Sequence, residues 1–217
     1  MKIDFHTHTF FSPDSSSPPE EMIEAAKKKG IQGLAITDHN EIRGALRAIE
    51  YAKEKPFLII PGIEVKTKEG DMLGLNVKKN IPKGLSAKET IKKIKEAGGI
   101  AILPHPFGLF QSFQGNLAGL IKEIDGIEVF NASIFGPGNK KALAFAQKHN
   151  LAFTAGSDAH SPESLGLAYL EIPGENLSVA EVLEAIKNRV GKVSGSEKLL
   201  SQKIIERGKR VRAFFGL

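Results

Sequence analysis

Five of the six histidines in this chain stand where a run of apolar residues gives way to polar ones. In an extended segment, residues i and i+2 face the same side, so His6 with His8, and Asp158 with His160, can each bind one metal ion. The chain has no cysteine, and imidazole and carboxylate ligands without thiolate favour zinc, manganese or iron over calcium. The spacing of these residues therefore predicts a metal centre.

The candidate ligands are too many for a single ion. They are His6, His8, Asp14, His39, Glu64, His105, Asp158 and His160. A tetrahedral zinc site needs four ligands, so this set predicts two or three divalent ions, with Glu64 or Asp158 shared between them. Asp38 is expected to orient His39 from outside the ligand set. His149 lies within helical sequence, and we expect a structural or surface role for it.

Apolar runs that alternate with helical sequence predict the scaffold of the metal centre. Strands are expected at 2–6, 33–37, 57–65, 100–104, 126–130, 151–156 and 166–172, with a hairpin-like stretch over 66–77. The runs are continuously apolar, which is typical of parallel strands covered on both faces. Seven such units predict an α/β fold, a distorted TIM-like (β/α)7 barrel with outer helices; a doubly wound open sheet is the alternative. In both folds the C-terminal strand ends share one face, where the metal site is expected.

The segments between the strands predict outer helices at 19–30, 41–55, 86–99, 137–150 and 178–191. The first begins with acids and ends with lysines, which complements the helix dipole. Ser86 and Glu89 predict a capping box at the start of the third. The longest irregular stretch, FGLFQSFQGN at 107–116, is expected to form a mobile loop over one face of the barrel.

The positive charge of the chain is concentrated at its end. The net charge is +5, and residues 198–217 hold six basic residues and one acidic residue, so the rest of the chain is neutral. We expect residues 1–193 to form the barrel and residues 194–217 a basic C-terminal helix packed on it or extending from it. A basic track for nucleic acid could lie only on this helix.

The composition indicates a soluble globular protein. Hydrophobic residues make up 41% and charged residues 25% of the chain, and no apolar run approaches the ~18 residues that predict a membrane span. No signal-peptide pattern is present at the N-terminus. We therefore expect a cytoplasmic protein without a membrane partner. The sequence leaves the oligomeric state open.

The ordered set of motifs resembles the polymerase-and-histidinol-phosphatase (PHP) family of metal-dependent phosphoesterases. The set comprises HTH, an acid six residues later, TDH, PGIE, HP and GSDAH, and the resemblance spans roughly residues 1–172. It implies a distorted seven-stranded barrel with a trinuclear site. It also implies one ion held by His6, His8, Glu64 and Asp158, a second by Glu64 and His105, and a third by Asp14, His39 and His160. Some members have a histidine after the fifth strand, where this chain offers Glu128 or Asn131.

The resemblance implies hydrolysis of phosphate esters by metal-bound hydroxide. A divalent ion lowers the pKa of its bound water to about 7, and paired ions stabilise the attacking and leaving oxygens. Catalytic roles would fall to Asp14, Asp158 and His160, with a protonated acid or histidine near the third ion assisting the leaving alkoxide. The candidates for contact with substrate are Arg43, Lys66, Asn131 and Ser133.

Four functions remain open, and a phosphatase acting on a small phosphorylated metabolite or nucleotide leads. A DNA or RNA exonuclease is the alternative; nucleic acid is a possible partner that the neutral barrel does not favour. A non-catalytic binding barrel is disfavoured because the ligand residues are present. A deacylating amidohydrolase is disfavoured because the fourth strand ends in His105 and offers no lysine.

Overall fold

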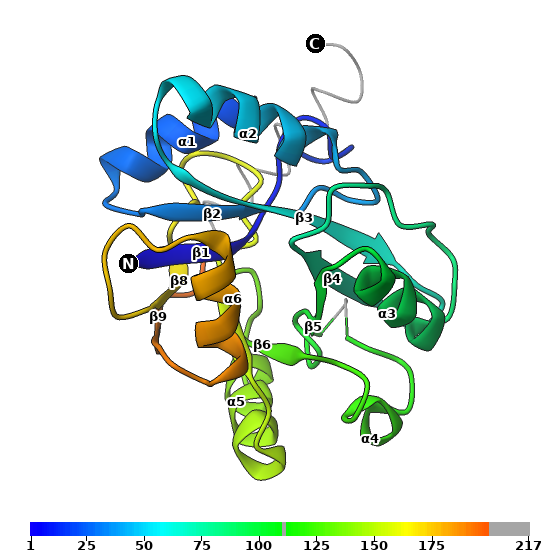
Figure 1. Cartoon of the computed structure of the whole chain (residues 1–217). Coiled ribbons are helices and arrows are strands. Elements are labelled where there is room, and N and C mark those ends of the chain that lie inside the picture. Colours follow the sequence, from blue (N-terminus) through cyan, green and yellow to red (C-terminus); the bar gives the residue numbers. More distant parts are fainter. Residues whose placement is uncertain (110–111, 200–217) are drawn as a thin grey trace.

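The computed structural model describes residues 1–109 and 112–199 (Figure 1). Its strands are β1 (Lys2–Thr7), β2 (Gly33–Ile36), β3 (Leu58–Lys66), β4 (Asp71–Leu75), β5 (Ile100–Leu103), β6 (Gly126–Asn131), β7 (Phe153–Gly156), β8 (Ala168–Glu171) and β9 (Lys192–Gly195). Its helices are α1 (Pro19–Lys28), α2 (Arg43–Glu54), α3 (Ala87–Glu96), α4 (Leu117–Leu120), α5 (Gly138–His149) and α6 (Val179–Lys187). The seven expected strands, the hairpin and the five expected outer helices are present, whereas β9 and the one-turn α4 were not expected.

The strands form one sheet in the order β7-β6-β5-β4-β3-β2-β1-β8-β9. A parallel bridge between Thr7 and Ala159 brings the two sides of this sheet together, so it curls into a nearly closed barrel. The α/β barrel expected from the sequence is therefore confirmed, with helices on its outside (Figure 1).

Two strands are antiparallel to their neighbours, whereas all strands of a regular (β/α) barrel are parallel. The expected hairpin places β4 inside the sheet, antiparallel to both β3 and β5. The seventh expected strand, β8, pairs antiparallel with β1. A strand reverses direction when no helix carries the chain back to the start of the sheet, and no helix separates β3 from β4 or β7 from β8. These two reversals are the distortion of the barrel.

Apolar side chains fill the barrel interior and the layer between the sheet and the helices. Inside, Ile3 and Phe5 of β1 pack with Ile60 and Ile102, and Ile186 of α6 belongs to the same cluster. A second cluster lies under α1, α2 and α3. Figure 1 shows α6 lying across one end of the barrel. The opposite end, where most strands finish, is left for polar residues.

Local sequence signals set the helix boundaries. Ser86 and Ser178 each begin a helix with a complete capping box, as expected at Ser86. The helix expected from residue 41 begins at Arg43, because Glu41 accepts hydrogen bonds from the backbone N–H groups of Ile42 and Arg43. Asn150 ends α5 in the left-handed conformation, which asparagine tolerates better than most residues.

Two expectations fall partly outside the described residues. The loop at 107–116 includes the undescribed residues 110–111; beyond them, the N–H groups of Phe113 and Gln114 donate to Pro106 and Glu69. Most of the expected C-terminal helix, from residue 200 onward, also lies outside the described residues. Before that point, β9 runs across the expected boundary at residue 193. Within the described ranges, no helix is long and apolar enough to cross a membrane.

Candidate metal centre

All eight candidate ligands gather at the same end of the barrel. His6 is part of β1 and His8 follows it, and Glu64 lies in β3. The others stand on segments that follow a strand: Asp14 after β1, His39 after β2, His105 after β5, and Asp158 and His160 after β7. His105 and Asp158 both have a positive φ, +30° and +51°. This strained backbone turns their side chains sharply as the chain leaves the sheet.

Three groups of side chains in this cluster have the spacing of a metal site. Within each group the potential ligand atoms lie within 4.8 Å of one another. The groups are His6, Glu64 and His105; His6, His8 and Asp158; and His8, Asp14, His39 and His160. The geometry therefore adds His6 to the pair Glu64 and His105, and adds His8 to the set implied for a third ion.

Shared atoms connect these three groups into one centre. Glu64 places Oε1 3.1 Å from His105 Nε2 and Oε2 3.0 Å from His39 Nδ1. Its Oε2 also lies 3.4 Å from both His6 Nε2 and His8 Nε2. Asp14 Oδ2 is 3.2 Å from the Nε2 atoms of His39 and His160. A single carboxylate thus faces several imidazoles, as expected of ligands shared between ions.

The unpaired atoms of the centre fit divalent metal ions. His6 Nε2, His8 Nε2, His160 Nε2 and Glu64 Oε2 are fully buried yet make no hydrogen bond with any described residue. Leaving such atoms without partners costs free energy. In these three histidines, Nδ1 instead donates to an oxygen: Glu128 Oε1, Ser12 Oγ and the Asp158 carbonyl, respectively. Each Nε2 is therefore left with its lone pair directed at the centre, as a metal ligand requires.

The protein charges strongly perturb the ionisation of these histidines. Burial alone would lower the pKa of His39, but the charges of Glu64 and Asp14 raise it to about 11. The pKa of His105 is raised to about 9, because the hydrogen bond with Glu64 outweighs its burial. The pKa of His8 is lowered to about 3 by burial and by the neighbouring His160 and His39. Without ions, some imidazoles of the centre therefore hold protons at neutral pH.

Comparison with known proteins identifies the family. Residues 4–160 match the PHP domain and residues 136–190 match the PHP-associated region. The chain belongs to the PHP domain family. The members of this family are metal-dependent phosphoesterases, which are hydrolases, so the expected family and enzyme class are confirmed.

Two relatives share substantial sequence with this PHP chain. It is 44% identical over 142 residues to the uncharacterized protein MJ1587 of Methanocaldococcus jannaschii, covering 61% of this chain and 82% of that protein. It is 33% identical over 105 residues to a 5'-3' exoribonuclease of Haemophilus influenzae, covering 46% of this chain and 38% of that enzyme.

Solved structures share the fold. A two-domain protein from Bacteroides vulgatus, described as containing a predicted PHP-like metal-dependent phosphoesterase, superimposes with a TM-score of 0.76 at 21% identity. The match covers 90% of this chain and 65% of that one. The lesion-specific endonuclease EndoQ of Pyrococcus furiosus matches with a TM-score of 0.63 at 19% identity, over 88% of this chain and 57% of that one.

Glu128 and Asn131, at the end of β6, support the PHP centre from beneath. Glu128 Oε1 accepts from His6 Nδ1, and its Oε2 accepts from the backbone N–H of His105 at 2.9 Å. Asn131 is fully buried and donates to the same Oε2 at 3.0 Å. Its Oδ1 accepts from the Ser133 N–H. The Asn131 side chain, predicted to touch substrate, is thus engaged with the carboxylate that orients two histidines.

Ser12 and Asp38 orient His8. Ser12 Oγ donates to Asp38 Oδ1 at 2.9 Å and accepts from the His8 ring and from the His39 backbone N–H. Asp38 also accepts from the backbone and hydroxyl of Thr9. From the sequence, Asp38 was expected to orient the His39 ring. In the structure, Asp38 instead binds Ser12, which contacts the ring of His8. Ser12 was missed because a serine in a polar loop gives no signal of its own.

The two basic residues predicted to contact substrate, Arg43 and Lys66, are largely exposed and paired with acids. The Arg43 side chain is 68% exposed and pairs with Glu41 at 2.7 Å. The Lys66 side chain is 61% exposed and pairs with Asp71 at 3.1 Å. Ser133 is half-buried, with its Oγ 3.5 Å from the Asp158 carbonyl oxygen. The expected surface role of His149 fits its place at the end of α5, where its ring lies 4.4 Å from that of Phe145.

Two buried charged residues near the centre were not singled out from the sequence. Asp4, in β1, accepts from the backbone and hydroxyl of Ser157 and from the Gly166 N–H, which ties the segment after β7 to β1. Burial raises the pKa of Asp4 to about 6 despite these hydrogen bonds. Lys198, which the charge count assigned to the tail, donates to the Asp158 carbonyl at 2.8 Å.

Proposed function

We propose that this PHP enzyme is a phosphomonoesterase that acts on a small phosphorylated metabolite or a nucleotide, using two or three divalent ions of zinc, manganese or iron. One observation carries the proposal: three groups of ligand atoms share His6 and His8, and their buried ring nitrogens Nε2 have no hydrogen-bond partner among the described residues. Such an arrangement suits several ions near one another, which is the arrangement that phosphoester hydrolysis uses.

When bound, the ions supply an activated water and neutralise charge on the phosphoryl group. The chain determines where this chemistry takes place. The side chains of His39 and Asp14 are 25% and 21% exposed, whereas those of the other six candidate ligands are at most 8% exposed. We assign the substrate entrance to this more open side of the centre.

We assign proton transfer to the residues at the open side. Asp14 Oδ2 lies 3.2 Å from His160 Nε2. Burial opposes ionisation of Asp14, but the neighbouring His160 and His39 hold the pKa of Asp14 well below its usual range. Asp14 is therefore ionised at neutral pH, so the proton that assists the leaving alkoxide would come from the histidine side of this contact, His160. Asp158 lies 3.3 Å from His8 Nε2 and contributes its carboxylate to the same group of ligands.

Arg43 and Lys66 are the candidates for gripping the phosphate. Both carry a carboxylate partner already, so each would exchange that partner for the substrate. Exposed ion pairs are worth only about 0–1 kcal/mol, so this exchange costs little. Ser133 is the corresponding candidate just after β6, whereas the fully buried Asn131 side chain is held by Glu128 and the Ser133 N–H.

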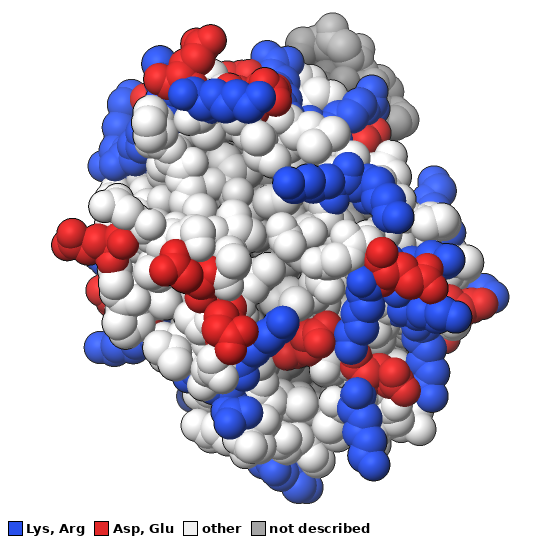
Figure 2. All heavy atoms as spheres, viewed as in Figure 1, with Lys and Arg blue, Asp and Glu red and all other residues white. Residues whose placement is uncertain are grey.

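An exonuclease is the second candidate, and the similarity to the Haemophilus influenzae 5'-3' exoribonuclease favours it. A nucleic-acid strand would need a continuous basic track beside the centre. On the face seen in Figure 2, which α6 crosses in Figure 1, Lys and Arg side chains are interleaved with Asp and Glu, so this face carries no continuous basic track. The observation that favours a phosphatase is that the two cations proposed to contact the phosphate, Arg43 and Lys66, are already paired with acids.

The test is a hydrolysis screen combined with metal analysis. The purified protein is assayed for bound metals and then against sugar phosphates, histidinol phosphate, 5'- and 3'-nucleotides and short oligonucleotides, with His105→Ala as the inactive control. We expect phosphate release from one class of monoester, at a rate that depends weakly on salt. Faster cleavage of oligonucleotides, with a steep loss of rate as salt rises, would select the nuclease. Equal rates for the wild type and His105→Ala would refute both.

A further inference from the structure

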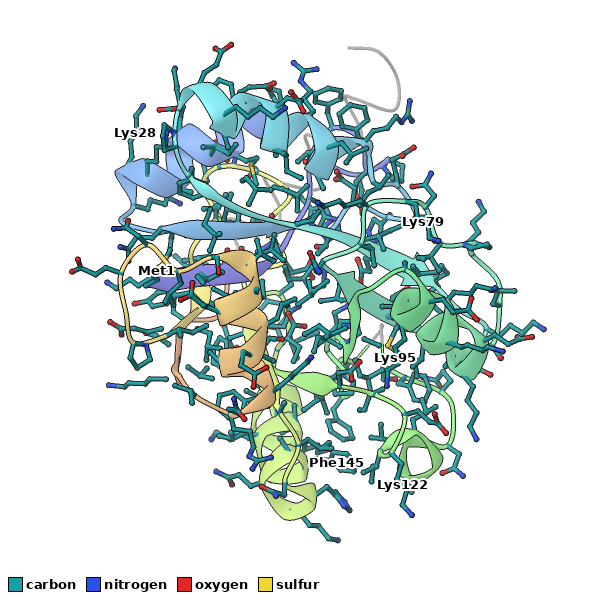
Figure 3. The ribbon with its side chains drawn as sticks, in the orientation of Figure 1. Met1, Lys28, Lys79, Lys95, Lys122 and Phe145 are labelled. Atoms are coloured by element: carbon teal, nitrogen blue, oxygen red, sulfur yellow. The ribbon has the colours of Figure 1, made fainter. Side chains whose placement is uncertain are left out.

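Lys198 differs from every other basic residue that the structure describes. It is 2% exposed, whereas the remaining described lysines and arginines are partly or fully exposed. Lys28, Lys79 and Lys122, for example, lie at the outer edge of the molecule (Figure 3). Burying an ammonium group is costly unless hydrogen bonds compensate for the lost water. The position of Lys198 therefore needs a reason.

The segment that carries Lys198 is attached across the polar end of the barrel. After β9, the Ser196 N–H donates to the Leu167 carbonyl oxygen and the Lys198 N–H donates to the Ala132 carbonyl oxygen, both at 2.8 Å. Ala132 directly follows β6, and Leu167 directly precedes β8. These two contacts fix the backbone of residue 198 beside the loop that holds Asp158.

The Lys198 ammonium donates to the main-chain oxygen of Asp158 at 2.8 Å. The same oxygen accepts from His160 Nδ1 at 2.9 Å. A carbonyl oxygen can only accept, so His160 carries its proton on Nδ1 and leaves Nε2 for an ion. One oxygen thus anchors both the lysine and a candidate ligand.

The peptide that supplies this oxygen also sets the direction of the Asp158 carboxylate. Asp158 has φ +51°, a left-handed conformation that costs free energy in a residue with a side chain. The carboxylate belongs to the group of His6, His8 and Asp158, while His160 belongs to the group of Asp14, His39 and His8. Any rotation of the Asp158 peptide would therefore disturb two groups of ligands together.

We propose that Lys198 is a positioning residue of the metal centre. Its hydrogen bond holds the Asp158 peptide in the left-handed conformation, so that the Asp158 carboxylate and the His160 ring point into their separate groups. The proposal makes the segment after β9 a working part of the centre. It rests on the metal-dependent function proposed above, but it concerns metal affinity and does not depend on the identity of the substrate.

The test is manganese binding to the full-length protein without substrate. Free Mn²⁺ is measured by electron paramagnetic resonance for the wild type, Lys198→Met, Lys198→Arg and the exposed control Lys192→Met. Residues that orient a metal ligand typically contribute 10–100-fold to affinity. We expect Lys198→Met to weaken Mn²⁺ binding by at least about tenfold. Lys198→Arg, which keeps a donor and the charge, should recover most of that loss, and Lys192→Met should bind as the wild type does.

NMR of the ring N–H groups of His160 gives a second readout. In the zinc-loaded wild type and in Lys198→Arg, we expect the ring proton on Nδ1 to be protected from exchange with solvent. In Lys198→Met this proton should exchange faster, because the carbonyl that accepts it is no longer held. A general loss of stability would expose many protons, whereas a positioning role affects the His160 ring first.

Each contrary result overturns the proposal. Wild-type affinity in Lys198→Met would show that the hydrogen bond does not position the ligands. Tighter binding in that variant would show that the ammonium acts only by repelling cations. If Lys198→Met does not fold, Lys198→Arg is compared with Lys198→Gln: a loss of about tenfold confined to Gln supports the proposal, and equal affinities overturn it. Failure of the substrate screen would leave these binding results unaffected, so the two proposals fail separately.

Discussion

The two ends of the barrel are built on opposite principles. At the α6 end, apolar side chains such as Ile3, Phe5 and Ile186 are fully buried and pack against one another. At the other end, several buried imidazole and carboxylate atoms have no hydrogen-bond partner in the part of the chain that the structure describes, and two ligand residues have a positive φ. Phe5 and His6 are consecutive in β1. Apolar packing at the α6 end stabilises the fold, whereas the unpaired polar atoms and strained backbone at the other end lower its stability, as is common at active sites.

The largest expected effect is a loss of activity at the functional end without a loss of stability. Asp158→Ala removes the carboxylate that faces His6 and His8, and we expect phosphoester hydrolysis to fall by at least about 10⁴-fold, because activation of the bound water requires a complete ligand set. The metal-free unfolding midpoint should stay within about 5 °C of wild type, because the apolar end is untouched. Initial rates and thermal melts check this, with the exposed Glu54→Ala as control. A residual rate above about 1% would contradict the assignment.

The next effect is a loss of stability at the apolar end without a loss of metal affinity. Ile186, on α6, is fully buried, and Ile186→Ala should lower the free energy of unfolding by about 2–5 kcal/mol, because it removes apolar contacts and leaves a cavity. Ile186→Val should cost about 0.5–1.5 kcal/mol. Denaturant unfolding measures both values. Below the unfolding transition, Mn²⁺ affinity should be unchanged in both variants; a loss of affinity in the folded state would show that the two ends are coupled.

A third effect concerns protons held by the functional end. In the metal-free protein, the raised pKa values of His39 and His105, about 11 and about 9, mean that both rings are protonated at pH 7. Their contribution to stability is complete below the unfolded pKa of about 6.5 and is lost as pH rises through about 9 and then about 11.

Metal ions must displace these protons. Between pH 6 and pH 8, apparent Mn²⁺ affinity should therefore rise about tenfold per pH unit for each proton released. Calorimetry in buffers of different ionisation enthalpy counts the protons. Affinity that is independent of pH, with no proton release, would show that the histidines are neutral before the ions bind.

The smallest expected effect concerns the exposed cations Arg43 and Lys66, which, unlike the ligands of the metal centre, are largely open to solvent. Arg43→Ala and Lys66→Ala each remove an exposed cation that already has an acidic partner. We expect KM to rise by no more than about fivefold and kcat to change by less than about twofold, in keeping with the small value of exposed ion pairs. Steady-state kinetics on the substrate found in the screen measures this. A loss of kcat above about tenfold would place the cation against the reacting phosphoryl group.

The sequence predicts the scaffold and the ligand cluster because both follow strong local rules. Continuous apolar runs mark β1, β2, β3, β5, β6 and β7, and parallel strands bring their C-terminal ends together. The side chains from HTH, TDH, PGIE, HP and GSDAH therefore had to lie near one another, whatever the details of the loops.

What the sequence could not predict depends on tertiary contacts. The antiparallel pairing of β8 with β1 leaves no mark in the composition of a short strand. The roles of Ser12 and Glu128 depend on hydrogen bonds between segments distant in the sequence. Lys198 reads as one of six charges in a basic tail, and only the fold shows that its side chain is buried against Asp158.

The two oxygens of Glu64 face different partners, Oε1 toward His105 and Oε2 toward His39, His6 and His8. A carboxylate divided in this way cannot adjust to one neighbour without moving relative to the other. We therefore expect an ion bound on one side of Glu64 to change the affinity on the other side, so that a metal titration gives a Hill coefficient different from one.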